Sequence, residues 1–134
     1  MLTGGCLCGA VRYAYEGEVG PAGFCHCEDC RRVSGSAFGV SVRAAASGFR
    51  VTAGVPKSFT RLGDSGRQVT RCFRGDCGSP LYTVPPFHPD VVFIKAGSLD
   101  DPSAVKPNRQ TWVRSRVVWA EIDPEIAACE TNRA

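Results

Sequence analysis

The segment FCHCEDCRR, residues 24–32, carries three cysteines in the spacing C-x-C-x2-C. Three thiolates are one ligand short of a closed, tetrahedral, all-cysteine zinc site, and this count is found where zinc keeps one position open for water or substrate. The density of thiols at Cys25, Cys27 and Cys30 exceeds what an ordinary core or loop requires. We therefore predict a metal site here, and the remaining sequence must indicate whether it is a working site or a structural clip.

The length and composition indicate one globular domain covering residues 1–134. Hydrophobic residues make up 43% of the chain and charged residues 22%, as in ordinary soluble proteins. No apolar run approaches the roughly 20 residues that span a bilayer, and the start MLTGGC lacks the features of a signal peptide. We therefore expect a cytoplasmic protein with reduced thiols, in which clustered cysteines favour metal binding or catalysis over disulfides. The net charge of +3 is too small to indicate nucleic-acid binding.

The other cysteines form two outer clusters and one isolated residue. Cys6 and Cys8 lie in a glycine-rich turn, Cys72 and Cys77 precede Gly78, and Cys129 stands alone. Cysteine pairs separated by dozens of residues are typical of zinc sites that join distant parts of a chain. Buried free thiols or a disulfide are the alternative, but the flanking glycines favour a metal site whose binding energy contributes to folding.

The hydrophobic pattern predicts an all-β domain. Short segments with strand periodicity recur without any long amphipathic helix. Two short helical stretches are expected, one turn at residues 31–34 and a C-terminal helix at about 124–130, where DPE supplies an N-cap, a proline and an acid. The predicted strands are residues 11–15, 38–42, 57–62, 67–73, 81–84, 91–94 and 111–122.

The central thiols have several possible roles. Zinc bound by three thiolates would lower the pKa of a bound thiol at its open position and polarise a carbonyl group. His26 alternates with the cysteines and is expected to point away, although a ligand role stays open. Cys27 and Cys30 alone could instead form a redox pair, or all three thiols could be free of metal.

Three motifs resemble one known family. GCLCG at residues 5–9, CHCEDCR at 25–31 and CGSPL at 77–81 occur in the order seen in the glutathione-dependent formaldehyde-activating enzyme family, which includes centromere-protein-V-like members. The segment RSR at 114–116, followed by Trp119, resembles the closing strand of that family. The resemblance covers residues 3 to 122.

This resemblance implies a specific architecture and activity. The fold would consist of packed antiparallel sheets in a β-tent, stapled by a structural zinc on Cys6, Cys8, Cys77 and a fourth ligand. A second zinc, labile or catalytic, would bind Cys25, Cys27 and Cys30. The implied activity is that of a carbon–sulfur lyase that joins glutathione and formaldehyde as S-hydroxymethylglutathione.

The sequence departs from the family pattern at two positions. Arg74 stands where the C-x2-C spacing of the family places a cysteine, and Cys72 lies two residues earlier. Two residues along a strand span about 7 Å and share one face, so we predict that Cys72 substitutes as the fourth ligand. Gln110 stands near the position of a histidine that is frequent in the family, which puts substrate handling in question.

Arg31 and Arg32 directly follow the thiol cluster and are predicted to bind the carboxylates of glutathione. Other arginines and the tryptophans are better explained as a solvated face and as strand aromatics than as a nucleic-acid surface. A second function class is a zinc-stapled binding module without catalysis. The number of zinc ions per chain distinguishes this class from the enzyme.

Overall fold

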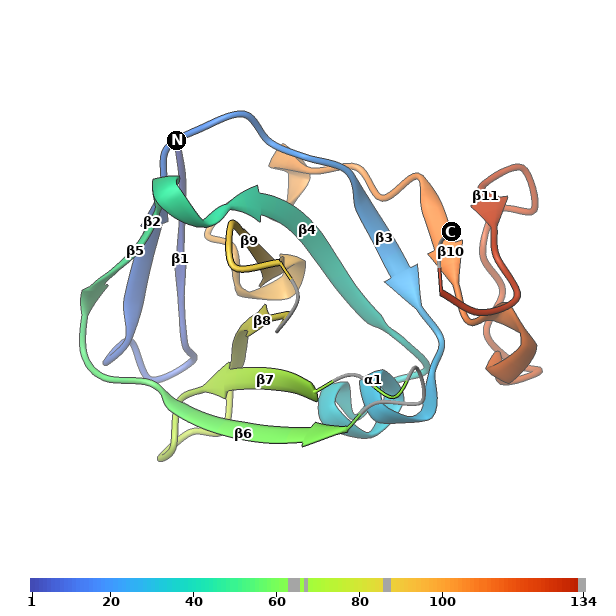
Figure 1. Ribbon diagram of the computed structural model, residues 1–134, viewed down its shortest axis with the longest axis horizontal. Helices are drawn as coiled ribbons and strands as arrows, with labels where there is room; N and C mark the ends of the chain where they lie inside the picture. The colour runs from blue at the N-terminus through green and yellow to red at the C-terminus, as the bar shows by residue number, and fades with distance from the viewer. Residues whose placement is uncertain (63–65, 67, 86–87, 133–134) are drawn as a thin grey trace.

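The computed structural model describes residues 1–62, 66, 68–85 and 88–132, and its strands form two sheets (Figure 1). The smaller sheet has the order β1 (Leu2–Gly5), β2 (Arg12–Tyr15) and β5 (Phe49–Ala53). The larger sheet has, side by side, β11 (Ala127–Ala128), β10 (Arg109–Thr111), β3 (Ala22–Cys25), β4 (Gly39–Ala45), β9 (Val91–Lys95), β8 (Pro80–Val84), β7 (Gln68–Phe73) and β6 (Lys57–Leu62).

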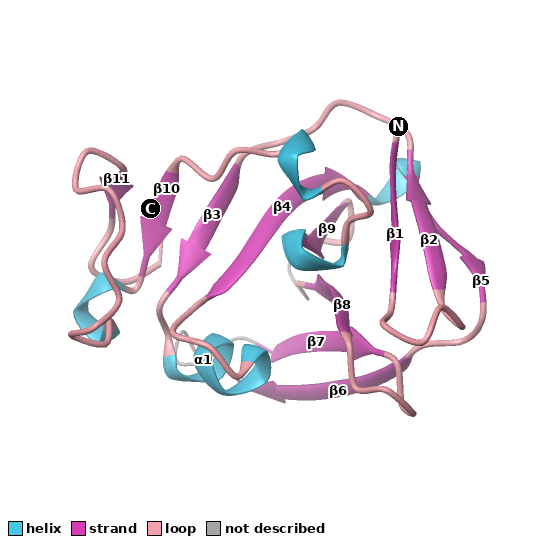
Figure 2. Ribbon diagram, turned by 180° about the vertical axis from the view of Figure 1, so that it is seen from behind, coloured by secondary structure: helices cyan, strands magenta, loops and turns pink. Residues whose placement is uncertain are grey.

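The larger sheet is strongly curved, so that β3 and β4 lie across from β7 and β6. Figure 1 shows β3 and β4 on one side, β9 and β8 behind, and β7 and β6 closing the opposite side. The smaller sheet stands at one end of this curve, and Figure 2 shows the same arrangement from behind. The protein is therefore all-β, as the hydrophobic pattern predicts.

Most strand pairs are antiparallel, but the prediction of purely antiparallel sheets needs one correction. β10 pairs in parallel with both β3 and β11. This pairing places the chain after residue 108 beside the strand that leads into the central cysteines, with the amide N–H of His26 donating to the carbonyl of Thr111.

The core lies between the two sheets. Tyr13 and Tyr15 of β2 are almost fully buried, and they pack in one cluster with Val42 of β4 and Ile94 of β9, neither of which is accessible to solvent. Burying such a side chain stabilises the fold by about 1.5–3 kcal/mol relative to leaving it exposed. The alternating apolar positions of these strands therefore hold the sheets together.

One α-helix and several 3-10 turns complete the described part of the chain. Helix α1 (Glu28–Ser34) follows β3 and ends at Gly35, which has the left-handed φ of 66° that favours glycine. The predicted single turn is thus a longer helix that begins inside the central cysteine segment. The 3-10 turns are Ala46–Gly48, Ala96–Ser98, Pro102–Ala104 and Val113–Ser115.

The predicted strand at residues 111–122 is wrong beyond its first residue. Trp112 has a left-handed backbone with φ of 56°, which ends β10, and a 3-10 turn follows. Val118 and Trp119 are 90% and 71% exposed, so these two apolar residues are not buried strand positions.

The predicted C-terminal helix at 124–130 is also wrong. Asp123 accepts a hydrogen bond from the amide N–H of Glu125, as an N-cap would, but the chain turns and then adds the short strand β11 to the sheet. The remaining predicted strands are present as β2, β4, β6, β7, β8 and β9, with shifted ends.

One expectation lies partly outside the described residues. The predicted strand at residues 67–73 starts at residue 67, which is not among the described residues. No helix among the described residues is long and apolar enough to cross a membrane.

Candidate metal centre

The central cysteines converge at the junction of β3 and α1. Cys25 ends β3, Cys27 is the N-cap of α1, and Cys30 lies in its first turn. Their three sulfur atoms lie within 4.8 Å of one another. The helix produces this convergence because its first turn brings Cys30 back over the N-cap, whose sulfur accepts the amide N–H of Cys30 at 3.3 Å. We call these three residues the inner triad.

The electrostatics of the inner triad favour a site that shares negative charge. The neighbouring thiols of Cys25 and Cys27 lower the pKa of Cys30, and the positive charges of Lys95 and Arg71 act in the same direction. The pKa of Cys27 is raised because its thiol faces the sulfurs of Cys25 and Cys30. The Cys30 thiolate is thus stabilised by its neighbours, whereas deprotonation of all three thiols requires a bound cation. This combination suits a divalent metal ion.

His26 points away from the triad, as the alternation predicts. Its side chain is fully buried, its Nε2 atom lies 2.9 Å from Oε1 of Gln110, and its ring packs edge-on against Phe38. Gln110, in the position where the family frequently has a histidine, is therefore a hydrogen-bond partner of the segment that carries the inner triad. This contact explains an amide at that position, since a glutamine oxygen can accept the imidazole N–H.

A second group of cysteines forms between the N-terminal turn and the turn before β8. Cys6, Cys8 and Cys77 place their sulfur atoms within 4.8 Å of one another, and we call them the outer triad. The amide N–H of Val11 donates to the Cys6 sulfur at 3.3 Å, as in a turn folded around a metal ligand. The Ser79 hydroxyl, followed by backbone N–H groups, lowers the pKa of Cys77 to about 6.

The two departures from the family pattern occupy different places. Cys72 lies on β7 opposite Ser58 and Tyr82, and the structure does not bring it together with the outer triad. Arg74 instead lies near Cys8, and its Nη2 donates to the Asp76 carboxylate at 2.7 Å, while its Nε atom is buried without a partner among the described residues. The outer triad thus offers three thiol ligands, with a guanidinium group beside them where a fourth cysteine is expected.

A cavity of about 600 Å³ lies between the two triads. Cys30 lines it on one side and Cys6 on the other, and Lys95 contributes an ammonium group. A cavity of this size falls within the range that encloses small-molecule ligands. The inner triad therefore faces space in which a substrate can lie.

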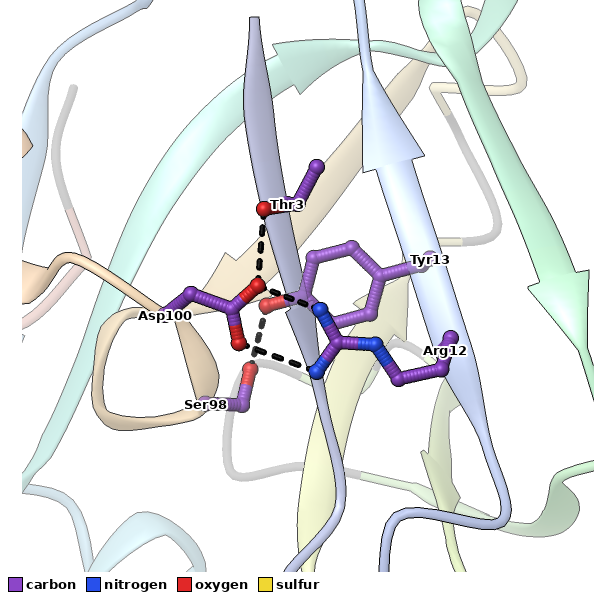
Figure 3. A network of polar contacts seen from close by, with 5 residues as sticks. All are labelled: Thr3, Arg12, Tyr13, Ser98 and Asp100. Atoms are coloured by element: carbon purple, nitrogen blue, oxygen red, sulfur yellow. Dashed lines mark hydrogen bonds and ion pairs between the residues drawn. The ribbon is translucent and has the colours of Figure 1, made fainter.

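At the other end of this cavity lies a polar network (Figure 3). The carboxylate of Asp100 accepts hydrogen bonds from the Arg12 guanidinium, at 2.9 Å for Nη1, and from the Thr3 hydroxyl at 2.7 Å. Beside it, the Tyr13 and Ser98 hydroxyl oxygens lie 2.5 Å apart. These contacts join β1 and β2 to the segment after β9 and fix one wall of the cavity.

The predicted substrate-binding arginines lie on α1. Arg32 is exposed and forms an i,i+4 ion pair with Glu28 at 3.0 Å, and Arg31 is half-buried. Sequence reasoning missed Lys95 and Arg71, the two cations whose charges act on Cys30. Each lies on a strand far from the cysteines in sequence, so no local spacing could indicate it.

Comparisons with known proteins agree with this geometry. A search of curated proteins found no match. Among solved structures, a crystal structure of a Rhodobacter sphaeroides protein is similar, with a TM-score of 0.59, 23% sequence identity, and coverage of 76% of this chain and 93% of that chain. The family model described as glutathione-dependent formaldehyde-activating enzyme matches residues 1–115, which contain both triads. The chain therefore belongs to the glutathione-dependent formaldehyde-activating enzyme family.

Proposed function

We propose that this protein is a zinc-dependent enzyme of the carbon–sulfur lyase type, which acts on adducts between glutathione and an aldehyde such as formaldehyde. In the synthetic direction the thiol sulfur adds to the carbonyl carbon. A carbon–sulfur bond forms, the carbonyl π bond breaks, and a proton reaches the oxygen to give S-hydroxymethylglutathione. The reverse reaction breaks the same carbon–sulfur bond.

The observation that carries the proposal is the position of the inner triad at the cavity. Cys30 lines the space, while Cys25 and Cys27 complete three ligands within 4.8 Å. The donor set fits zinc, which binds thiolates and keeps a fourth position open in catalytic sites. Zinc bound there would supply Lewis acidity and lower the pKa of a bound thiol.

The residues of the chain would orient and enclose the reactants. Helix α1 fixes Cys27 and Cys30 through its N-cap contact, and β3 fixes Cys25 through its pairing with Gly39. The cavity beside them would hold the thiol and the aldehyde close together, and such positioning supplies much of the rate enhancement of a two-reactant addition. The outer triad would stabilise the fold rather than take part in the reaction.

The proposal predicts a specific loss on changing one inner cysteine. Cys25→Ser should lower the zinc content by about one ion per chain, because one of three thiolate ligands is removed. It should also abolish acceleration of S-hydroxymethylglutathione formation over the spontaneous rate. Metal analysis and an NMR assay of the adduct measure the two effects.

The matched control is Cys129→Ser, which changes a cysteine outside both triads. This variant should keep wild-type zinc content and activity. If Cys25→Ser changes neither zinc content nor glutathione binding, the enzyme proposal fails. If the wild-type protein accelerates no thiol–aldehyde addition, the result would instead favour the alternative, a zinc-stapled binding module without catalysis.

A further inference from the structure

The strand register places two cations on the same face of the larger sheet as Cys25. Cys25 lies opposite Gly39, and Ser41, two residues further along β4, lies opposite Lys95. Side chains two residues apart share one face of a strand, and directly paired residues share one face of a sheet. Lys95 is therefore on the face that carries the inner triad.

The same face continues across the next two strands. Phe93, two residues before Lys95, lies opposite Thr83, and Thr83 lies opposite Arg71. Thr83 and Arg71 are thus directly paired across β8 and β7, and Lys95 lies on the same face of β9, two residues beyond the partner of Thr83. We call these three residues the cationic subsite.

Lys95 is close to the inner triad. A methyl group placed on Gly39 would lie 3.6 Å from Sγ of Cys30 and 3.8 Å from Nζ of Lys95, so both atoms border the same small space. Nζ donates one hydrogen bond, to the Ser41 hydroxyl at 3.2 Å, and no described carboxylate lies within ion-pair distance of it. An ammonium group has three donors, so Lys95 has donors available beside the cavity that it lines.

Arg71 and Thr83 are buried with hydrogen-bonding capacity left over. Each is only 9% exposed, and neither Nη1 of Arg71 nor Oγ1 of Thr83 has a partner among the described residues. Burying a charged donor without a partner costs several kcal/mol, so such groups are normally satisfied by an anion, by water or by a ligand. Their direct cross-strand pairing places both side chains on the face of the sheet that carries Lys95.

The unpartnered donors of the cationic subsite could bind an anion on the face of the sheet that carries the inner triad. We propose that the cationic subsite binds a carboxylate group of the thiol substrate, so that the sulfur of the substrate lies at the inner triad while its carboxylate lies at Lys95, Arg71 and Thr83. The inference rests on the proposed function, because it requires that the inner triad binds a thiol. The substrate class that follows is a thiol that also carries a carboxylate group, rather than an uncharged thiol.

The cationic subsite suits this role better than the arginines of α1. Arg32 is 68% exposed and already paired with Glu28, and a solvated ion pair contributes little binding energy. Charges with little contact to water interact more strongly with a ligand. We therefore assign carboxylate binding to the cationic subsite, in place of Arg31 and Arg32, for which the sequence predicted this role.

The test compares two small thiols that differ in a carboxylate. The dissociation constants of 3-mercaptopropionate and 2-mercaptoethanol are measured by calorimetry on the purified zinc-containing protein without any aldehyde. Lys95→Met should weaken binding of 3-mercaptopropionate by about tenfold or more, the effect of losing a hydrogen bond to a charged group. It should leave binding of 2-mercaptoethanol and the zinc content within twofold of wild type.

Two further variants sharpen the result. Lys106→Met removes an exposed lysine by the same substitution and should change neither dissociation constant. Arg71→Lys keeps a positive charge and should retain part of the preference for 3-mercaptopropionate that Arg71→Gln loses. If Arg71→Gln does not fold, the Lys95 comparison still decides the question.

The outcomes separate this inference from the proposed function. Equal weakening of both thiols, or loss of zinc in Lys95→Met, would overturn the cationic subsite and assign Lys95 to charge balance at the inner triad. Selective weakening without any acceleration of adduct formation would support the subsite while rejecting the proposed reaction. Selective weakening together with acceleration would support both.

Discussion

At Arg74 a single residue changes the composition of a candidate metal site. Its guanidinium lies near Cys8, and the described residues bring three sulfur atoms together in the outer triad. Three thiolates and a neighbouring cation carry less net negative charge than four thiolates. Such a site should hold zinc less tightly than a closed four-cysteine site, in which metal binding contributes directly to folding.

Replacing this residue by cysteine should therefore strengthen the outer site. Arg74→Cys should slow the release of zinc to a chelator by at least about tenfold, since even a change in a hydrogen-bonding neighbour of a ligand alters metal affinity by that factor. Release is followed with a chromogenic chelator. Arg74→Ala is the control, because it removes the guanidinium without adding a sulfur. Equal zinc retention in the two variants would mean that position 74 does not face the ion.

The sequence predicted the cysteines of both triads because ligand spacing within a turn is a local property. Cys25, Cys27 and Cys30 converge through one strand end and one helical turn. The prediction that Cys72 serves as the fourth ligand depended instead on the path of β7. The pairing of β7 with β8 shifts register between Cys72 and Phe73. A pattern of residue types carries no information about such a shift, and the structure leaves Cys72 opposite Tyr82.

Helix α1 is the element that turns a thiol-rich segment into a site. It presents Cys30 to the cavity, and its Asp29 lies 3.6 Å from Arg61 of β6, which ties the helix to the far end of the sheet. The helix has only two turns and buries no residue fully, so its ends contribute much of its stability. Gly35 provides one of these ends, with its amide N–H donating to the carbonyl of Arg31 at 3.0 Å.

Changing this glycine should destabilise the helix end. Gly35→Ala places a Cβ on a residue with φ of 66°, and the left-handed conformation costs a non-glycine residue about 1 kcal/mol. Chemical denaturation should show a loss of unfolding free energy of that size. Gly97→Ala is the matched control, because its φ is not left-handed and an added Cβ meets no neighbour within 4 Å. A loss of similar size in both variants would argue against strain at Gly35.

At the level of elements, alternation predicted the strands that line the core and failed for the C-terminal segment. Residues 111–122 contain enough apolar side chains to suggest a strand, yet Trp112 turns the backbone and Trp119 is exposed. Likewise, the helix-start signal at Asp123 is also a turn signal, and only the pairing of β11 with β10 decides between them. The secondary structure of the C-terminal segment therefore depends on strand pairing with distant residues, which the local sequence pattern does not contain.

The arrangement of the whole molecule explains why the cationic subsite was absent from sequence reasoning. Lys95 and Arg71 become neighbours of the inner triad only through four successive strand pairings from β3 to β7. The opposite face of β4 and β9 packs against the smaller sheet, where Val42 and Ile94 are buried. The same core packing that joins the sheets thus also places positive charge at the site.

The network around Asp100 ties the smaller sheet to the segment that follows β9 through an ion pair and hydrogen bonds (Figure 3). The Arg12 guanidinium, with help from the Thr3 hydroxyl, lowers the pKa of Asp100 to about 2. Since an unfolded aspartate has a pKa near about 3.9, this ion pair stabilises the folded state above about pH 4. Its contribution is lost as the pH falls from there towards 2.

Asp100→Asn should therefore lower the unfolding free energy at pH 7 and flatten its decline between about pH 4 and 2. The side chains of Arg12 and Asp100 are 37% and 46% exposed, so screening limits the effect to about 1 kcal/mol or less, and added salt should reduce it further. Urea denaturation at several pH values, at low and high salt, measures this difference. Glu121→Gln, which removes an exposed carboxylate that forms no ion pair within the described part of the chain, should leave the pH profile unchanged. If the unfolding free energy of Asp100→Asn falls as steeply between about pH 4 and 2 as that of wild type, the Arg12–Asp100 ion pair does not contribute to stability.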